Sequence, residues 1–375
     1  MMSGVKLGLG LVGAVGATLL GIAMISKFQT PPLEVVQRGY RGTAMQVNYN
    51  EKELAQYLAE NKVPASLPQA PAAGPKAGVV YKNVQVLGDL SVGQFTRLMV
   101  SITNWVSPKQ GCAYCHNTAN MSEDNLYTKI VSRRMFQMTQ HINADWQAHV
   151  QGTGVTCYTC HRGNPVPNNI WFHDPGTRTP GGGMIDAGPP VGKNIAAASV
   201  RYASLPYDPF TPFLEGDHSI RVQGEEALPG SNRHSIKEAE WTFALMNYFG
   251  NSLGVNCTYC HNSRAFSDWS QSSPAKVVAW HGIRMTRDLN NDYLKSLTNA
   301  WPANRLGPTG DSPKLACATC HQGVYKPLYG VSMLKDFPEL SHPGGAGVAY
   351  LNAAWTPPNG SMEQAKPAGQ PKIGE

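Results

Sequence analysis

An uncharged apolar run opens the chain. The 20 residues from Leu7 to Ser26 carry no charged side chain, and Lys6 and Lys27 flank them. Twenty helical residues at about 1.5 Å each match the roughly 30 Å hydrocarbon core of a bilayer. The run therefore predicts a transmembrane anchor within residues 1–28. A cleavable signal peptide is the alternative, although its apolar region is usually only about 7–15 residues long.

After the anchor, short helical patterns alternate with irregular stretches. Residues 29–78 are rich in proline and alanine and predict an extended strap or linker with one short helix around residues 51–60. A longer helical pattern covers residues 127–150. Residues 166–235 read as a connecting loop region, and residues 355–375 as a flexible C-terminal tail.

Between these regions lie two stretches that resemble each other, residues 79–165 and 236–354. The similar strings are Phe95-Thr-Arg-Leu-Met99 with Thr242-Phe-Ala-Leu-Met246, and Met138-Thr-Gln-His-Ile-Asn143 with Met285-Thr-Arg-Asp-Leu-Asn290. Such internal similarity predicts a duplication. The expected fold is mainly α, with two pseudo-repeated halves, much irregular loop and one N-terminal transmembrane helix.

The cysteines reveal what the repeated stretches carry. All eight fall in four C-x-x-C-H motifs, numbered here in chain order: Cys112–Cys115–His116, Cys157–Cys160–His161, Cys257–Cys260–His261 and Cys317–Cys320–His321. In this motif two cysteines form thioethers with a haem, and the adjacent histidine is the proximal iron ligand. Two motifs fall in each repeat, so the sequence predicts four covalently bound haem c groups in two haem-pair halves.

Other uses of paired cysteines fit less well. A disulfide scaffold, zinc sites and thioredoxin-like redox pairs also employ C-x-x-C. Here, however, each pair is followed directly by histidine and no cysteine is left over. Covalent haem also places the mature chain outside the bacterial cytoplasm. The formal charge of +6, with no clustered basic run, gives no indication of nucleic-acid binding.

An electron-transfer haem usually has protein ligands on both iron faces, whereas a catalytic haem keeps one face open. Met99 precedes His116 by 17 residues and Met246 precedes His261 by 15. Both lie on helical apolar segments that turn back into their motifs. We therefore predict Met99 and Met246 as distal ligands of the first and third haems.

The second and fourth haems leave two alternatives. Alignment of the repeats pairs Met135 with Gly282 and gives His149 no histidine counterpart, so the first half holds a spare ligand. The simplest exchange gives Met135 to the second haem and His149 to the fourth. Alternatively, Met138 and Met285 serve these haems directly, and spacing alone does not decide. The remaining histidines are interpreted as surface or hydrogen-bonding residues: His141, His173, His218, His234, His281 and His342.

The chain closely resembles the tetrahaem cytochrome subunit of purple-bacterial photosynthetic reaction centres. The resemblance covers most of the chain from about Gln37 onward. The strings that carry it are Gln37-Arg-Gly-Tyr-Arg-Gly42, Arg133-Arg-Met-Phe-Gln-Met-Thr139, Gly154-Val-Thr-Cys-Tyr-Thr-Cys-His-Arg-Gly163, Leu253-Gly-Val-Asn-Cys-Thr-Tyr-Cys-His-Asn262 and Gly282-Ile-Arg-Met-Thr-Arg-Asp-Leu-Asn290.

This resemblance implies Met99, Met135 and Met246 as distal ligands of the first three haems and His149 for the fourth. It further implies the spatial order three, four, two, one, with the third haem nearest the bacteriochlorophyll special pair. The implied partners are the L, M and H reaction-centre subunits, the light-harvesting antenna, and a soluble cytochrome c or high-potential iron–sulfur protein as electron donor. Many family members carry a lipid-modified cysteine at the N-terminus, and this chain has none.

The expected function is electron transfer that re-reduces the photo-oxidised special pair, and we do not expect an enzyme. The expected location is the photosynthetic inner membrane, with a single membrane pass and the haem domain in the periplasm. A membrane-anchored donor to a respiratory reductase is the alternative. A haem peroxidase or nitrite reductase is a further rival, which would require an open iron face.

Overall fold

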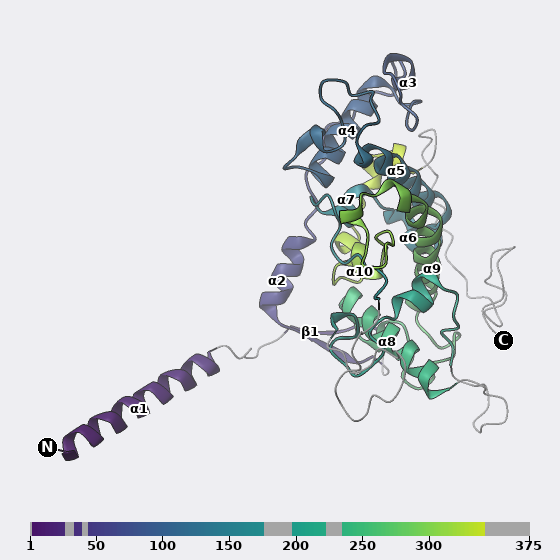
Figure 1. Ribbon diagram of the computed structural model, residues 1–375. Coiled ribbons are helices and arrows are strands. Elements are labelled where there is room, and N and C mark those ends of the chain that lie inside the picture. Colours follow the sequence, from purple (N-terminus) through teal and green to yellow (C-terminus); the bar gives the residue numbers. More distant parts are fainter. Residues whose placement is uncertain (1, 27–33, 40–43, 176–196, 223–234, 342–375) are drawn as a thin grey trace.

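The computed structural model describes residues 2–26, 34–39, 44–175, 197–222 and 235–341, with side chains of the first helix from Leu11 onward. The chain is mainly helical, as predicted (Figure 1). The helices are α1 (Met2–Ile25), α2 (Glu51–Glu60), α3 (Ala77–Val80), α4 (Val92–Val106), α5 (Tyr127–Asp145), α6 (Gln147–Val150), α7 (Cys157–His161), α8 (Ile236–Leu253), α9 (Pro274–Asp288) and α10 (Cys317–His321).

Short helical turns connect these elements. Those with 3-10 geometry are η1 (Gly111–Tyr114), η2 (Gln151–Thr153), η3 (Ala198–Val200), η5 (Cys257–Tyr259), η7 (Lys295–Ala300), η8 (Ala303–Arg305), η9 (Pro327–Gly330), η10 (Leu334–Asp336) and η11 (Pro338–Leu340). Two have π-helical geometry, η4 (Thr211–Glu215) and η6 (Leu289–Leu294). The predicted C-terminal tail, His234 and His342 lie outside the described residues.

Helix α1 coincides with most of the apolar run. Its described apolar side chains are largely exposed, between 51% and 71%: Leu11, Val12, Val15, Leu19, Leu20, Ile22, Met24 and Ile25. Among the residues whose side chains are described, no helix combines the length and the apolar character needed to cross a bilayer.

The strap contains the predicted helix α2 and a two-stranded sheet that the sequence did not predict. Strands β1 (Glu34–Gln37) and β2 (Gln46–Tyr49) pair antiparallel. This hairpin contacts the third motif: the Met45 backbone N–H donates to Thr258 Oγ1 at 2.7 Å, and the Tyr49 hydroxyl donates to the Gly254 carbonyl. The strap therefore lies against the second half of the chain.

The two similar stretches form the same order of elements. The first contains α4, η1, α5 and α7, and the second contains α8, η5, α9 and α10. Helices α4 and α8 both begin with a capping box, in which Ser91 pairs with Gln94 and Ser235 pairs with Glu238. The shared local sequence thus produces shared helix starts.

A buried asparagine explains why the strings ending in Asn143 and Asn290 are alike. The Asn143 amide donates to the Val155 carbonyl at 2.9 Å, and its oxygen accepts from the Val155 N–H at 2.8 Å. Asn290 does the same with Leu315, at 3.0 and 2.7 Å. Each asparagine therefore holds the segment that leads into the second or fourth motif.

The helix predicted over residues 127–150 is interrupted once. Trp146 leaves helical geometry (φ −108°, ψ 29°) and separates α5 from α6. Its indole N–H donates to Asp288 Oδ2 of α9 at 2.7 Å. After the break, α6 carries His149 toward the second half of the chain. There His149 Nδ1 donates to the Val278 carbonyl at 2.8 Å.

Two segments outside the shared elements of the repeats also pack into the cores of the halves. Residues 328–340, which follow the fourth motif, pack on α4, where Phe337 meets Trp105 edge-on with ring centroids 4.6 Å apart. The region predicted as a connecting loop contributes Leu214 to a core cluster with Tyr248 and Ile283. The described part of that region therefore contributes apolar side chains to the core of the second half.

We expect the contact between α5 and α9 to weaken as pH rises. His141 Nε2 lies 2.6 Å from Asp288 Oδ2, and its Nδ1 lies 2.7 Å from Asp145 Oδ2. Burial alone would lower the pKa of His141, but the hydrogen bonds to the two carboxylates raise it above its usual range. The resulting stability is fully present below about pH 6.5 and is lost as pH rises through the raised pKa.

Thermal unfolding followed across this pH range would test the contact. The Tm of the native chain should fall as pH rises, and His141→Gln should flatten that fall. The same slope in both chains would show that the histidine does not link pH to stability.

Candidate functional site

The four motifs take two local forms. The second and fourth are single helical turns, α7 and α10, each followed by a left-handed residue, Arg162 or Gln322. The first and third lie at the short turns η1 and η5. Each left-handed residue is followed by a glycine whose φ is also positive, +83° at Gly163 and +81° at Gly323. Positive φ is a conformation that favours glycine.

Each motif histidine donates its Nδ1 hydrogen to a backbone carbonyl. The acceptors are Met121 O for His116 (3.2 Å), Asn164 O for His161 (2.8 Å), Phe266 O for His261 (2.9 Å) and Val324 O for His321 (3.0 Å). The acceptor lies five residues after the first and third histidines and three after the second and fourth. A carbonyl cannot donate, so Nδ1 carries the hydrogen and Nε2 is left as a lone-pair donor, the form that binds a metal.

Lowered pKa values in four of the candidate ligand histidines favour the neutral form that metal ligation requires. Burial lowers the pKa of His161, His261 and His149, and it lowers the pKa of His321 to about 4. The buried thiols are protonated for the same reason. Burial raises the pKa of Cys157 to about 12, a value that keeps the sulfur uncharged.

His149 faces the fourth motif across a narrow gap. Its ring centroid lies 6.1 Å from that of His321, with an interplanar angle of 64°. A metal–imidazole bond is about 2 Å long, so two imidazoles on opposite faces of one metal ion place their centroids about 6 Å apart. The structure thus brings together the two side chains predicted to ligate the fourth haem.

Gly282 makes room for this arrangement. A Cβ at Gly282 would lie 2.5 Å from His149 Cε1 and 2.7 Å from His149 Nδ1. The equivalent position in the first half is Met135. The second half therefore has a glycine where the first has a methionine, and the space holds the ring of His149.

The predicted methionines differ in burial. Met99, Met135 and Met246 are half-buried. Met138 and Met285, by contrast, are 8% and 9% exposed and belong to one apolar cluster between α5 and α9. The alternative that assigns Met138 and Met285 as ligands has less support, because their side chains already fill the core.

Comparison with known proteins decides the family. A family model described as "Photosynthetic reaction centre cytochrome C subunit" matches residues 29–341. Proteins named photosynthetic reaction center cytochrome c subunit are similar: that of Thermochromatium tepidum is 53% identical over 84% of this chain and 77% of its own, that of Rubrivivax gelatinosus 51% over 87% and 88%, and that of Roseobacter denitrificans 41% over 88% and 92%.

The chain belongs to this family. As a reaction-centre cytochrome c subunit it is an electron-transfer protein and not an enzyme, as predicted. Family membership implies covalently bound haem c and association with a photosynthetic reaction centre in its membrane.

A buried cation in this cytochrome subunit fits the acidic edge of a haem. Arg284 of α9 is 6% exposed, and among the described residues neither terminal nitrogen of its guanidinium has a hydrogen-bond partner. The guanidinium lies 4.4 Å from the centre of the Trp280 ring. Haem c carries two propionate carboxylates, and a bidentate guanidinium is a favoured partner for a carboxylate. The paired histidines and this unpartnered arginine both fit the group.

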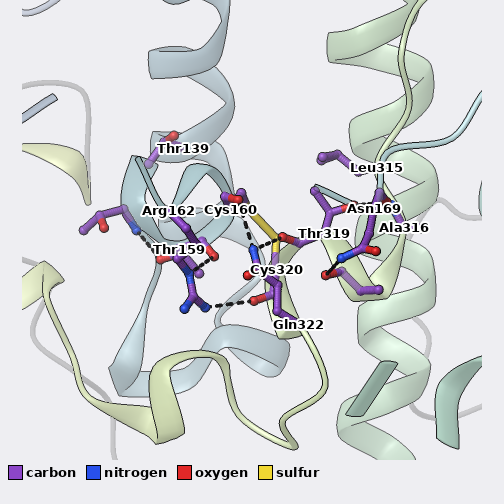
Figure 2. The surroundings of a disulfide bond; sticks show 12 residues. Thr139, Thr159, Cys160, Arg162, Asn169, Leu315, Ala316, Thr319, Cys320 and Gln322 are labelled. Carbon is purple, nitrogen blue, oxygen red and sulfur yellow. Dashed lines mark hydrogen bonds between the residues drawn. A yellow bond between two sulfur atoms is a disulfide. The ribbon is translucent and has the colours of Figure 1, made fainter. Parts of the chain in front are cut away.

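The second and fourth motifs meet directly in this structure (Figure 2). Cys160 and Cys320 form a disulfide, with Cα atoms 4.5 Å apart, whereas the other six cysteines are free. Around it, Arg162 Nη2 donates to the Cys320 carbonyl at 3.4 Å and Gln322 Nε2 donates to the Cys160 carbonyl at 3.3 Å.

Nothing in the sequence indicated this disulfide, because two motifs 160 residues apart are not visibly neighbours. A sulfur atom cannot hold a thioether and a disulfide together. Thioethers at Cys160 and Cys320 would need both sulfur atoms as thiols.

Two of the other predicted histidines form the hydrogen bonds expected of them. His141 bridges α5 and α9, and His173 Nε2 lies 2.5 Å from Glu215 Oε2. The backbone carbonyls that accept from the motif histidines were missed, because any residue type supplies a carbonyl. The one signal that could have indicated them is the spacing from histidine to acceptor, which is the same in the first and third motifs and the same in the second and fourth.

Met135 and Met138 can be separated experimentally. Met135→Leu should open one iron face of the second haem, because leucine has no ligating atom, so the reduced chain should bind carbon monoxide at one haem. Met138→Leu is a volume-conserving core change that costs under about 1.5 kcal/mol and should leave all haem spectra unchanged. Carbon monoxide binding in Met138→Leu alone would favour the alternative assignment.

Proposed function

We propose that this cytochrome subunit holds four haem c groups and re-reduces the photo-oxidised special pair of its reaction centre. The eight motif cysteines would form the thioethers. The proposed axial pairs are His116 with Met99, His161 with Met135, His261 with Met246, and His321 with His149. The observation that carries this proposal is the gap between His149 and His321, which fits one iron with two imidazole ligands.

The ligand set implies a pattern of potentials. Methionine–histidine ligation gives a higher potential than ligation by two histidines, so the fourth haem is the lowest of the four. In the spatial order three, four, two, one, the low-potential fourth haem then lies between the high-potential third and second haems.

Two contacts and the placement of the helices support that order. The hairpin of β1 and β2 covers the third motif, and residues 26–33 between α1 and β1 span at most about 28 Å. The second and fourth motifs touch through Cys160 and Cys320. Figure 1 shows α8 and β1 at one end of the haem domain and α3 and α4 at the other. The third haem is then nearest the membrane and the first is farthest from it.

The proposed partners follow from this arrangement. The third haem faces the L and M subunits, in a complex that also holds the H subunit and the antenna. A soluble cytochrome c or high-potential iron–sulfur protein delivers electrons at the first haem.

We also propose that α1 is a single-pass anchor with the haem domain in the periplasm. The support is the uncharged sequence of the run and the exposure of its described apolar side chains, which lipid would cover. A chain without residues 1–28 should leave the membrane fraction on washing. Retention of that chain in membranes would contradict the anchor.

Flash absorption spectroscopy on native membranes at controlled potential tests the function. A single flash should oxidise a c-type haem at the rate at which the bleached special pair recovers. Four reducible haems that never respond to light would instead favour a donor to a respiratory reductase.

A further inference from the structure

The carbonyl that orients the first motif histidine accepts a second hydrogen bond. His116 Nδ1 lies 3.2 Å from Met121 O, and the ammonium of Lys129 donates to the same oxygen at 2.8 Å. Lys129 is 8% exposed and also donates to Glu123 O at 2.7 Å. A lysine is almost never this buried without a specific reason.

The third motif repeats this arrangement. His261 Nδ1 lies 2.9 Å from Phe266 O, and the ammonium of Lys276 donates to that oxygen at 3.0 Å. Lys276 is also 8% exposed. Lys129 and Lys276 are each the third residue of their helix, α5 and α9. The two halves therefore place a buried cation at the same point behind the proximal histidine.

The second and fourth motifs differ. Their histidines donate to Asn164 O and Val324 O. In the part of the chain that the structure describes, no lysine donates to either oxygen. The cation thus accompanies the two motifs at short 3-10 turns and is absent from the two helical ones.

We propose that Lys129 and Lys276 raise the potentials of the first and third haems by sharing the carbonyl acceptor of the proximal histidine. This inference rests on the proposed attachment of haem at these motifs. The lysines touch neither iron nor haem in this scheme and act as positioning residues.

Two effects of each lysine have the same sign. A carbonyl that already accepts from an ammonium is a weaker acceptor for the imidazole N–H, so the imidazole donates less electron density to the iron. The buried positive charge also favours the ferrous state, which carries one positive charge less than the ferric state. Both effects stabilise reduced iron.

The effect should be larger at the third haem. The ammonium of Lys129 lies 3.2 Å from Asp124 Oδ1, whose negative charge offsets it. Lys276 instead contacts uncharged groups: the Phe266 and Asp268 carbonyls, the Ser272 hydroxyl at 3.1 Å, and the Trp269 ring, whose centre is 4.3 Å from Nζ. Among the described residues Lys276 has no carboxylate within 4.0 Å, and only the longer-range attraction of Asp268 offsets its charge. The less strongly offset cation is therefore behind the haem placed nearest the special pair.

Equilibrium redox titration of the full chain in native membranes tests this. Lys276→Met removes the charge and keeps the chain length, and Lys276→Arg keeps the charge. The methionine variant should shift the ferrous-to-ferric ratio of one haem toward ferric by tenfold or more at fixed potential, about 59 mV for a one-electron couple. The arginine variant should shift it less. Lys129→Met should shift a different haem, by a smaller amount.

Haem counting separates the possible failures. A native chain with fewer than four covalent haems would overturn the proposed function and this inference with it. Four haems in Lys276→Met with all four potentials unchanged, or all four shifted equally, would overturn this inference alone. If Lys276→Met does not fold, Lys129→Met decides: a shift confined to one haem supports the inference, and no shift overturns it.

Discussion

Replacing Gly282 with alanine is expected to remove His149 from the fourth haem. The new Cβ would lie 2.5, 2.7 and 3.1 Å from three ring atoms of His149, and the first two distances are shorter than real Cβ contacts. The ring must move, and it then loses its hydrogen bond to the Val278 carbonyl as well. Overpacking of this kind costs about 1–3 kcal/mol. The fourth haem should lose the spectroscopic signature of two histidine ligands, and the reduced chain should bind carbon monoxide at one haem.

Gly93→Ala is the matched control for Gly282→Ala. Gly93 also lies in a helix, α4, where an added Cβ would meet the nearest atom at 3.5 Å, an ordinary contact. Alanine in a helix is more favourable than glycine by about 0.5–1 kcal/mol, so this variant should keep all haem properties. If both variants keep four six-coordinate haems, the proposed assignment of His149 is wrong.

The prediction that pairs His149 with the fourth motif has a physical basis. The distal ligands considered for this chain are histidine and methionine, so a ligand lost in one half is visible against its counterpart in the other. Gly282 in place of Met135 is such a loss, and the structure brings His149 to that same point. Few residue types were candidates for the ligands, and the repeat defines equivalent positions in the two halves. This part of the site could therefore be predicted from the sequence.

Other features carried no such signal. The break at Trp146, the contact of the hairpin with the third motif and the packing of residues 328–340 on α4 all depend on tertiary contacts between distant segments. The meeting of Cys160 with Cys320 is of the same kind. Short helices with few charged residues do not indicate, from sequence alone, which distant segments will pack together.

The order of the haems gives the second large effect. Removing the cysteines of the third motif, with Cys257→Ala and Cys260→Ala, should abolish rapid re-reduction of the special pair after a single flash. The reason is distance: the hairpin contacts the third motif, and in the proposed order an electron would otherwise have to come from a haem farther from the special pair. Flash absorption of the special pair and of the haem α-band in the same membranes would measure this loss.

The first motif provides the matched variant, Cys112→Ala with Cys115→Ala. Both motifs lie at short 3-10 turns with an exposed first cysteine, so the two changes should disturb the fold to a similar degree. Without the first haem, the response to a single flash should keep its speed, because the third haem is intact. Over repeated flashes the response should fade, since the soluble donor would have lost its proposed point of entry. The reverse result, a lost first flash response in this variant and a normal one without the third haem, would reverse the proposed order of the chain of haems.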